Sequence, residues 1–98
     1  MNREEVLTFL KSKKREFHDK FHVSEIGLFG SLARNEQQAG SDIDLIVEFE
    51  SGTNDIYSMK EGIREIIADR FQTRVDIGRK KSLKSFYRKQ IMSDAIFI

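Results

Sequence analysis

The spacing of apolar residues changes along the first third of the chain, from a helical period to an alternating one. Asn2 and Glu5 form a capping pair that predicts a helix beginning near the N-terminus. The apolar side of this helix consists of Val6, Leu7, Leu10, Phe17 and Phe21. Residues 23–30, VSEIGLFG, then indicate a strand that ends at a glycine. Ser31 follows at the position of an N-cap, which predicts a short helix over LARNE before a turn at QQAGS.

The most regular alternation in the sequence runs from residue 42 to residue 49. One face of this predicted strand carries Ile43, Leu45, Val47 and Phe49. The other face carries Asp42, Asp44, Ile46 and Glu48. Because successive side chains of a strand point to opposite faces of its sheet, we expect the first face in the core and the second turned away from it.

The remaining half of the chain predicts a helix, a strand and a last helix. After the turn SGTND, apolar residues at helical spacing are Ile56, Met59, Ile63, Ile66, Ile67 and Phe71. In TRVDIG, Val75 and Ile77 point one way and Asp76 the other. A helix after Ser82 has an apolar side made of Leu83, Phe86, Tyr87, Ile91 and Met92. The closing residues AIFI predict either a short strand or an apolar patch that awaits a partner.

This order of helices and strands predicts an α/β fold. We expect a small sandwich in which a mixed three- or four-stranded sheet has its helices packed mainly on one face. With 98 residues the chain is too short for two separate cores, so residues 1–98 are interpreted as a single domain.

Composition narrows the class of protein further. The chain has no cysteine, which excludes a disulfide framework and a thiolate metal site. Its first residues lack the pattern of a signal peptide, and no apolar run is long enough to span a membrane. The net charge of +1 is too balanced for a general nucleic-acid coat. We therefore expect a soluble cytoplasmic protein with no membrane contact and no direct nucleic-acid substrate.

Three aspartates stand out on the polar face of the predicted sheet. Asp42 and Asp44 project side by side from one strand, and Asp76 repeats their placement on the next. If the two strands are neighbours, the carboxylates converge and repel one another unless a divalent cation lies between them. Mg²⁺ prefers such oxygen ligands together with substrate phosphate, and two ions about 3.5–4 Å apart would clamp a phosphoryl displacement. Upstream, Gly30 and Ser31 join a strand end to a helix start, where free backbone N–H groups favour a phosphate.

The spacing of these residues is similar to that of a known family. A Gly-Ser pair at 30 and 31, ten further residues and the DID of 42–44 resemble the signature of the DNA polymerase β-like nucleotidyltransferase superfamily. The longer string FGSLAR…SDIDLIVEF resembles its minimal, antitoxin-like members, which are paired with HEPN-domain ribonuclease toxins. The resemblance implies that Gly30 and Ser31 hold the nucleotide phosphates. It also implies that Asp42, Asp44 and Asp76 are the catalytic, Mg²⁺-binding triad, the third of which helps to activate the acceptor hydroxyl.

The chain departs from the family pattern at one position. Asn35 stands where the family usually has glycine. Asparagine tolerates a positive φ better than most residues, so we expect the turn to survive.

The activity that the resemblance implies is Mg²⁺-dependent transfer of AMP from ATP to a tyrosine of a cognate HEPN ribonuclease toxin, which would silence it. Two alternatives stay open. The chain could be a non-catalytic antitoxin that masks its partner, or a catalytic subunit that modifies a small molecule held by a partner protein.

Several candidate residues also have a purely structural interpretation. Asp42 and Asp44 could occupy a solvated strand face, and Asp76 could pair with Arg74 or Arg79 on the surface. The basic cluster of Arg79, Lys80, Lys81, Lys84, Arg88 and Lys89 could be a solubilising face, or a patch that meets triphosphate, an acidic partner or RNA. His18 and His22 are four residues apart, a spacing that can hold a metal on a helix, but no third ligand is evident and exposed structural histidines are favoured.

Overall fold

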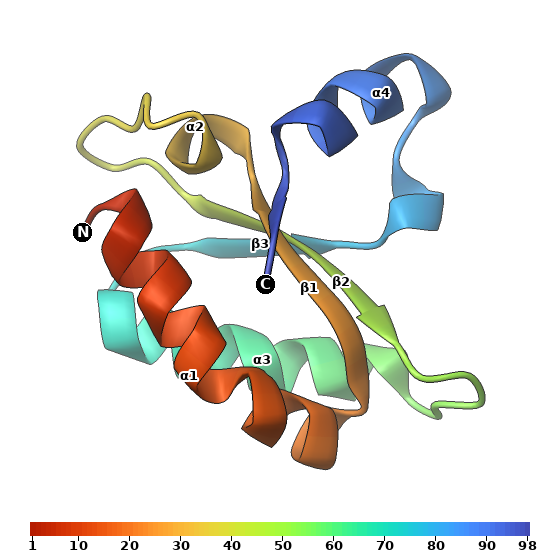
Figure 1. The fold of residues 1–98 in the computed structure, drawn as a ribbon. Helices are drawn as coiled ribbons and strands as arrows, with labels where there is room; N and C mark the ends of the chain where they lie inside the picture. The colour runs from red at the N-terminus through yellow and green to blue at the C-terminus, as the bar shows by residue number, and fades with distance from the viewer.

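Four α-helices, one 3-10 helix and four strands follow one another in the computed structural model, which describes residues 1–98 (Figure 1). In chain order the elements are α1 (Arg3–Phe21), β1 (Val23–Phe29), α2 (Gly30–Ala33), β2 (Ile43–Phe49), α3 (Ile56–Phe71), β3 (Val75–Gly78), the 3-10 helix η1 (Lys80–Ser82), α4 (Ser85–Asp94) and β4 (Ile96–Phe97). None of the helices is long and apolar enough to cross a lipid bilayer.

The strands form one mixed sheet in the order β3-β2-β1-β4. β1 is antiparallel to both β2 and β4, and β2 is parallel to β3. The predicted α/β fold with a mixed sheet is therefore confirmed. The closing residues adopt the first of the two expected forms, because Phe97 pairs with Gly27 and the N–H of Ile98 donates to the carbonyl of Ile26 at 3.1 Å.

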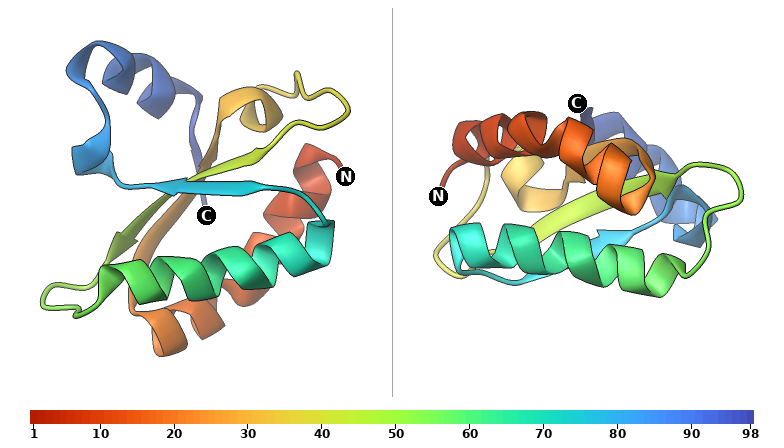
Figure 2. Two further views of the ribbon diagram at one scale, coloured as in Figure 1. Left: turned by 180° about the vertical axis from the view of Figure 1, so that it is seen from behind. Right: turned by 90° about the horizontal axis from the view of Figure 1, so that it is seen from below.

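The core lies between the sheet and the helices α1 and α3, which cover the same face (Figure 2). The alternation predicted for residues 42–49 is confirmed there, since Ile43, Leu45 and Val47 are fully buried. Leu10 and Phe17 of α1, and Ile63 and Ile67 of α3, are fully buried in the same cluster. Each such side chain stabilises the fold by roughly 1.5–3 kcal/mol relative to an exposed one.

One apolar side chain, Ile46, is buried on the opposite face of the sheet. Ile46 is fully buried although it lies on that face and outside the main core cluster. Its register partner on β1 is Gly27, and the ring of Phe97 lies against Gly27 so closely that a Cβ there would be 2.7 Å from the ring. The C-terminal strand thus supplies the apolar cover that this face otherwise lacks.

Of the two N-caps expected from the sequence, Asn2 and Ser31, the structure confirms only the first. Asn2 caps α1 as predicted, since its side chain accepts the N–H of Glu5 at 2.9 Å. Ser31 is not an N-cap, and that prediction is wrong. α2 begins two residues earlier than predicted, with Phe29 as its N-cap, and the carbonyl of Gly30 already accepts the N–H of Arg34 at 3.2 Å.

The last helix does not pack as its apolar pattern predicts. α4 begins at Ser85 after the short η1 and has no buried residue. It lies with α2 on the side of the sheet away from α1 and α3 (Figures 1 and 2). Phe86 and Tyr87, expected on its apolar side, are 75% and 51% exposed. The other residues of its predicted apolar side, Leu83, Ile91 and Met92, are only partly buried, because the sheet face beneath α4 is largely polar and only the short α2 lies beside it.

Candidate active site

The parallel pairing of β2 with β3 brings two of the three candidate aspartates together. Asp44 and Asp76 are register partners in this pair, so their side chains leave the same face of the sheet on adjacent strands. Neighbouring strands lie about 5 Å apart, which is close for two carboxylates. Asp42 directly precedes β2 and is partly buried, whereas Asp76 is exposed. A groove of about 680 Å³ beside Asp76 is lined by Arg64, Arg74 and six other residues.

Gly30 lies directly against the second aspartate of this group. Its φ is +78°, a conformation that favours glycine, and a Cβ at this position would collide with the carboxylate oxygen Oδ2 of Asp44. Two independent constraints therefore require glycine here. The contact also places the start of α2 beside the aspartates, so that Gly30 and Ser31 border the same small region as Asp44.

The electrostatics of this region are dominated by uncompensated negative charge. The pKa of Asp44 is raised from 3.8 to about 6, chiefly by burial and in addition by the negative charges of Asp76 and Asp42. Arg34 acts the other way and lowers this pKa. The ion pairs of the protein all use other carboxylates, so no basic side chain neutralises Asp42, Asp44 or Asp76 directly.

The predicted metal role of the three carboxylates fits their chemistry. Oxygen ligands from aspartate are those that Mg²⁺ prefers, and the raised pKa of Asp44 reflects a negative field that a cation would relieve. In this structure the side chains of Asp42, Asp44 and Asp76 do not form a closed group of three ligands. Their role as metal ligands therefore stays a prediction.

Arg34 is a residue near the site that sequence reasoning did not single out. It follows α2, donates from Nε to Glu36 at 3.1 Å and lies 3.6 Å from Asp94 of α4 through Nη1. It therefore links the start of the site to α4. Its position four residues after Gly30, at the end of the same helical turn, could have identified Arg34 from the sequence.

Asn35, in the turn after α2, has the expected backbone conformation, whereas α2 itself is shorter than expected. Asn35 has a φ of +60°, so the predicted tolerance of a positive φ is confirmed at this position. α2 is only four residues long, so its dipole is weaker than the expected helix start implied. The predicted phosphate binding by Gly30 and Ser31 would therefore depend on their local N–H groups and the Ser31 hydroxyl.

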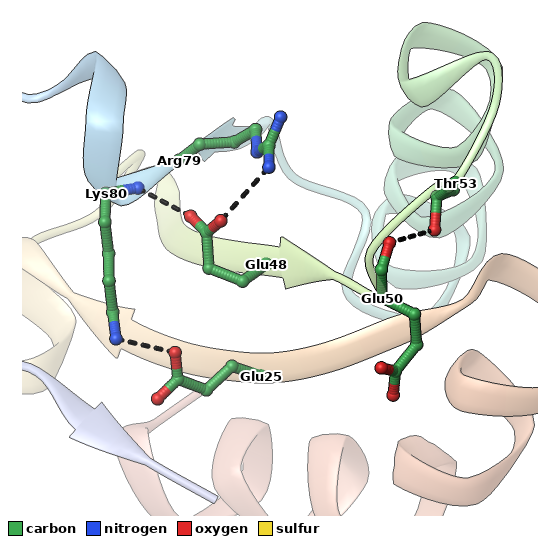
Figure 3. Close-up of polar contacts among 6 residues, drawn as sticks. All are labelled: Glu25, Glu48, Glu50, Thr53, Arg79 and Lys80. Atoms are coloured by element: carbon green, nitrogen blue, oxygen red, sulfur yellow. Dashed lines mark hydrogen bonds and ion pairs between the residues drawn. The ribbon is translucent and has the colours of Figure 1, made fainter.

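The basic cluster predicted after the third strand is divided in two by the structure. Arg79 donates to Glu48 at 3.2 Å, and Lys80 contacts Glu48 through its backbone N–H at 2.7 Å (Figure 3). The ammonium of Lys80 also lies 2.6 Å from Glu25. Because Arg79 is bound to Glu48, it does not pair with Asp76. Lys81, Lys84, Arg88 and Lys89 are exposed instead.

The two histidines do not form a helical pair. His22 ends α1 with a φ of +61°, so only His18 lies within the helix. His18 contacts Asp19 and Glu50, and its pKa is raised, mainly by the hydrogen bond to Asp19. These contacts agree with the structural interpretation of His18, and His22 is the C-cap of α1 through its backbone N–H.

The sheet order, the glycine that follows β1 and the paired aspartates agree with those expected of a nucleotidyltransferase. The chain belongs to the nucleotidyltransferase domain family, whose model matches residues 6–98. Protein adenylyltransferase MntA of Thermococcus cleftensis is similar to it, with 35% identity over 97 residues that cover 97% of this chain and 94% of the relative. A candidate protein adenylyltransferase of Methanocaldococcus jannaschii, MJ1379, is 36% identical over 95 residues, which are 96% of this chain and 95% of that one.

Solved structures agree with the fold. A candidate minimal nucleotidyltransferase superposes with a TM-score of 0.78 at 26% identity, covering 98% of this chain and 95% of the other. A toxin–antitoxin complex with AMP-PNP has a TM-score of 0.64 at 20% identity and covers 99% of this chain and 72% of its own. At that identity the second likeness concerns the fold alone.

Proposed function

We propose that this nucleotidyltransferase is a Mg²⁺-dependent protein adenylyltransferase that acts as an antitoxin, transferring AMP from ATP to a tyrosine of a HEPN-domain ribonuclease. The observation that carries the proposal is the pairing of Asp44 with Asp76 beside Gly30, where negative charge has no basic partner. The similarity to curated protein adenylyltransferases over almost the whole chain supports it.

Each residue of the site has a role in this proposal. Asp42 and Asp44 would hold Mg²⁺, with Asp76 as a third ligand, and the metal would neutralise charge on the triphosphate. The lack of a Cβ at Gly30 lets the carboxylate of Asp44 lie against the start of α2, where Ser31 would offer a hydroxyl and an N–H to the phosphates. A carboxylate is a suitable base for a hydroxyl that enters from the groove beside Asp76.

The proposed reaction is an exchange at the α-phosphorus of ATP. The tyrosine oxygen forms a bond to this phosphorus while the bond to the β-phosphate oxygen breaks, and pyrophosphate leaves. The proton of the hydroxyl passes to Asp76 and from there to solvent. Catalysis then depends on positioning and on neutralising charge, as phosphoryl transfer generally requires.

The test is to incubate the purified chain with ATP labelled at the α-phosphate, Mg²⁺ and a HEPN-domain protein encoded beside it. We expect label on a tyrosine of the HEPN protein and loss of its ribonuclease activity. The double variant D42N/D44N should transfer no label, and omission of Mg²⁺ should have the same effect. Glu65→Gln, an exposed change on α3, is the matched control and should transfer label normally.

The same experiment separates the two alternatives. A masking antitoxin would inhibit the ribonuclease without ATP and would still do so as D42N/D44N. A subunit that modifies a small molecule would label that molecule and leave the HEPN protein unlabelled.

A further inference from the structure

The surface of α4 carries an exposed aromatic pair among basic side chains. We call the residues Lys81, Lys84, Phe86, Tyr87, Arg88 and Lys89 the α4 patch. The rings of Phe86 and Tyr87 lie 4.3 Å apart between centroids with 36° between their planes. Phe86 is 75% exposed. A solubilising face has no physical need for such a ring, because exposing it to water is unfavourable.

The cations of the patch are also unpaired. Lys81, Lys84, Arg88 and Lys89 take part in none of the ion pairs of the protein, whereas the preceding Arg79 and Lys80 are bound to Glu48 and Glu25. The patch therefore combines an apolar centre with an uncompensated positive rim. This is the arrangement of a protein docking surface, in which aromatic and arginine side chains are the usual anchors.

The patch is connected to the candidate active site through the fold. α4 lies on the same side of the sheet as α2, away from α1 and α3 (Figure 1). The contact between Arg34 and Asp94, at 3.6 Å, ties the end of α4 to the turn that follows Gly30. The patch lies at the start of α4 and this contact at its end, so a bound protein that extends along the helix would reach the side of the sheet that carries Asp44 and Asp76.

We propose that the α4 patch docks the acceptor protein through a surface on that protein that is acidic around an apolar pocket. This inference rests on the proposed function, since it names the surface that would present the acceptor hydroxyl to the site. The positive rim selects an acidic partner, and the aromatic pair fills its pocket. RNA is the less suitable occupant, because the chain as a whole has a net charge of only +1, whereas nucleic-acid binding depends on many basic side chains that contact phosphates.

The chain offers matched controls for both halves of the patch. Tyr57 on α3 is 74% exposed, so Tyr57→Ala removes a comparably exposed ring elsewhere. Lys11 and Lys14 on α1 are exposed and form no ion pair, so K11E/K14E reverses two charges away from α4. The corresponding test variants are F86A/Y87A and K84E/K89E.

The experiment measures the dissociation constant of each variant for the purified HEPN-domain protein by calorimetry, and in parallel its affinity for ATP with Mg²⁺. We expect F86A/Y87A to weaken protein binding by about 30-fold or more. K84E/K89E should weaken it about tenfold at low salt, and less at high salt, because exposed charges are screened. Neither control should change protein binding by more than about twofold, and ATP binding should be unchanged throughout.

Several results would overturn the docking proposal. These are no binding of the HEPN-domain protein by the wild type, equal binding by patch and control variants, or loss of ATP binding in the patch variants. Displacement of the HEPN-domain protein by a short RNA oligonucleotide, with F86A/Y87A losing RNA affinity, would assign the patch to nucleic acid instead. If docking depends on the patch but the wild type transfers no label, the proposed function fails while the docking surface stands.

Discussion

Asp44 and Asp76 are paired residues on the parallel strands β2 and β3, so two carboxylates face the same side of the sheet on adjacent strands. Like charges in this position destabilise a sheet. Burial and the negative charges of Asp76 and Asp42 raise the pKa of Asp44 to about 6, so this pKa reflects the repulsion between the carboxylates. The pairing is unfavourable for the fold alone and is suited to a site that binds a cation with its substrate.

Asp44→Asn should stabilise the metal-free protein at neutral pH. In the wild type the folded state holds the Asp44 proton more tightly than the unfolded state does, so stability falls as pH rises from about 4 to about 6. A rise of the pKa from 3.8 to about 6 would correspond to about 3 kcal/mol for a group fully shielded from solvent. Because the group is only half-buried and solvent screens it, we expect about 1 kcal/mol.

The measurement is urea denaturation at pH 4 and pH 7.5 for the wild type, Asp44→Asn and the exposed control Glu65→Gln. The asparagine variant should gain stability over the wild type only at the higher pH. Equal stability of these two proteins at both pH values would contradict the raised pKa.

Binding of Mg²⁺ with ATP should depend on pH through the same group. A proton on Asp44 competes with the metal, so the affinity should fall as the pH drops below about 6. Thermal shift measurements with and without Mg²⁺ and ATP between pH 5 and pH 8 would show this. The shift in melting temperature should disappear in Asp44→Asn at every pH.

Gly30→Ala should damage both stability and nucleotide binding. The added Cβ collides with Oδ2 of Asp44 and forces a non-glycine residue to a φ of +78°. Gly40→Ala is the matched control, because Gly40 has a φ of +85° and open space around its Cβ position. The control should lose about 1–2 kcal/mol from its φ alone, and Gly30→Ala should lose more.

ATP affinity distinguishes the two glycine variants further. Gly40→Ala should bind ATP with Mg²⁺ normally, whereas Gly30→Ala should bind it at least about tenfold more weakly because Asp44 is displaced. Similar ATP affinities for the two variants would show that Gly30 is needed only for the backbone conformation of the turn and not for nucleotide binding.

Asp76→Asn should separate catalysis from folding. Asp76 is exposed and forms no ion pair, so its replacement should leave the melting temperature within a few degrees of the wild type. Loss of a metal ligand and proton acceptor should lower AMP transfer by about 100-fold or more. Transfer assayed with α-labelled ATP, against Glu65→Gln on α3 as control, checks this prediction. Normal transfer by Asp76→Asn would show that Asp76 is not part of the site.

Lys80→Met should destabilise the protein by a modest amount away from the site. Glu25 and Glu48 are register partners on β1 and β2, and Lys80 contacts both (Figure 3). The backbone N–H of residue 80 and the guanidinium of Arg79 still hold Glu48, whereas Glu25 loses the ammonium that offsets its repulsion from Glu48. This loss costs about 0.5–1 kcal/mol for partly exposed groups. Adding Glu25→Gln should restore most of the loss. Denaturation of the two single variants and the double variant gives the coupling, and purely additive effects would contradict it.

Much of the fold and part of the site could be predicted because they depend on patterns within a few residues. The cap at Asn2, the buried alternation of β2 and the helix Ile56–Phe71 are local in this sense. The start of α2 could not be placed correctly, since Gly30 adopts its conformation against Asp44, fourteen positions away by residue number. The apolar side of α4 was misread for a related reason: spacing shows which residues share a face, and not whether anything covers it.

Sequence patterning was sufficient to place Asp42, Asp44 and Asp76 on the polar side of their strands, because the direction of a side chain follows from its position in the strand. Only the assembled sheet decided that β3 lies parallel to β2 with Asp76 opposite Asp44, and that Arg79 and Lys80 turn to Glu48 and Glu25. This strand pairing and these ion pairs are contacts between segments that are far apart in the sequence. They are settled by which faces can be buried together and which charges remain to be neutralised, and no local pattern contains that information.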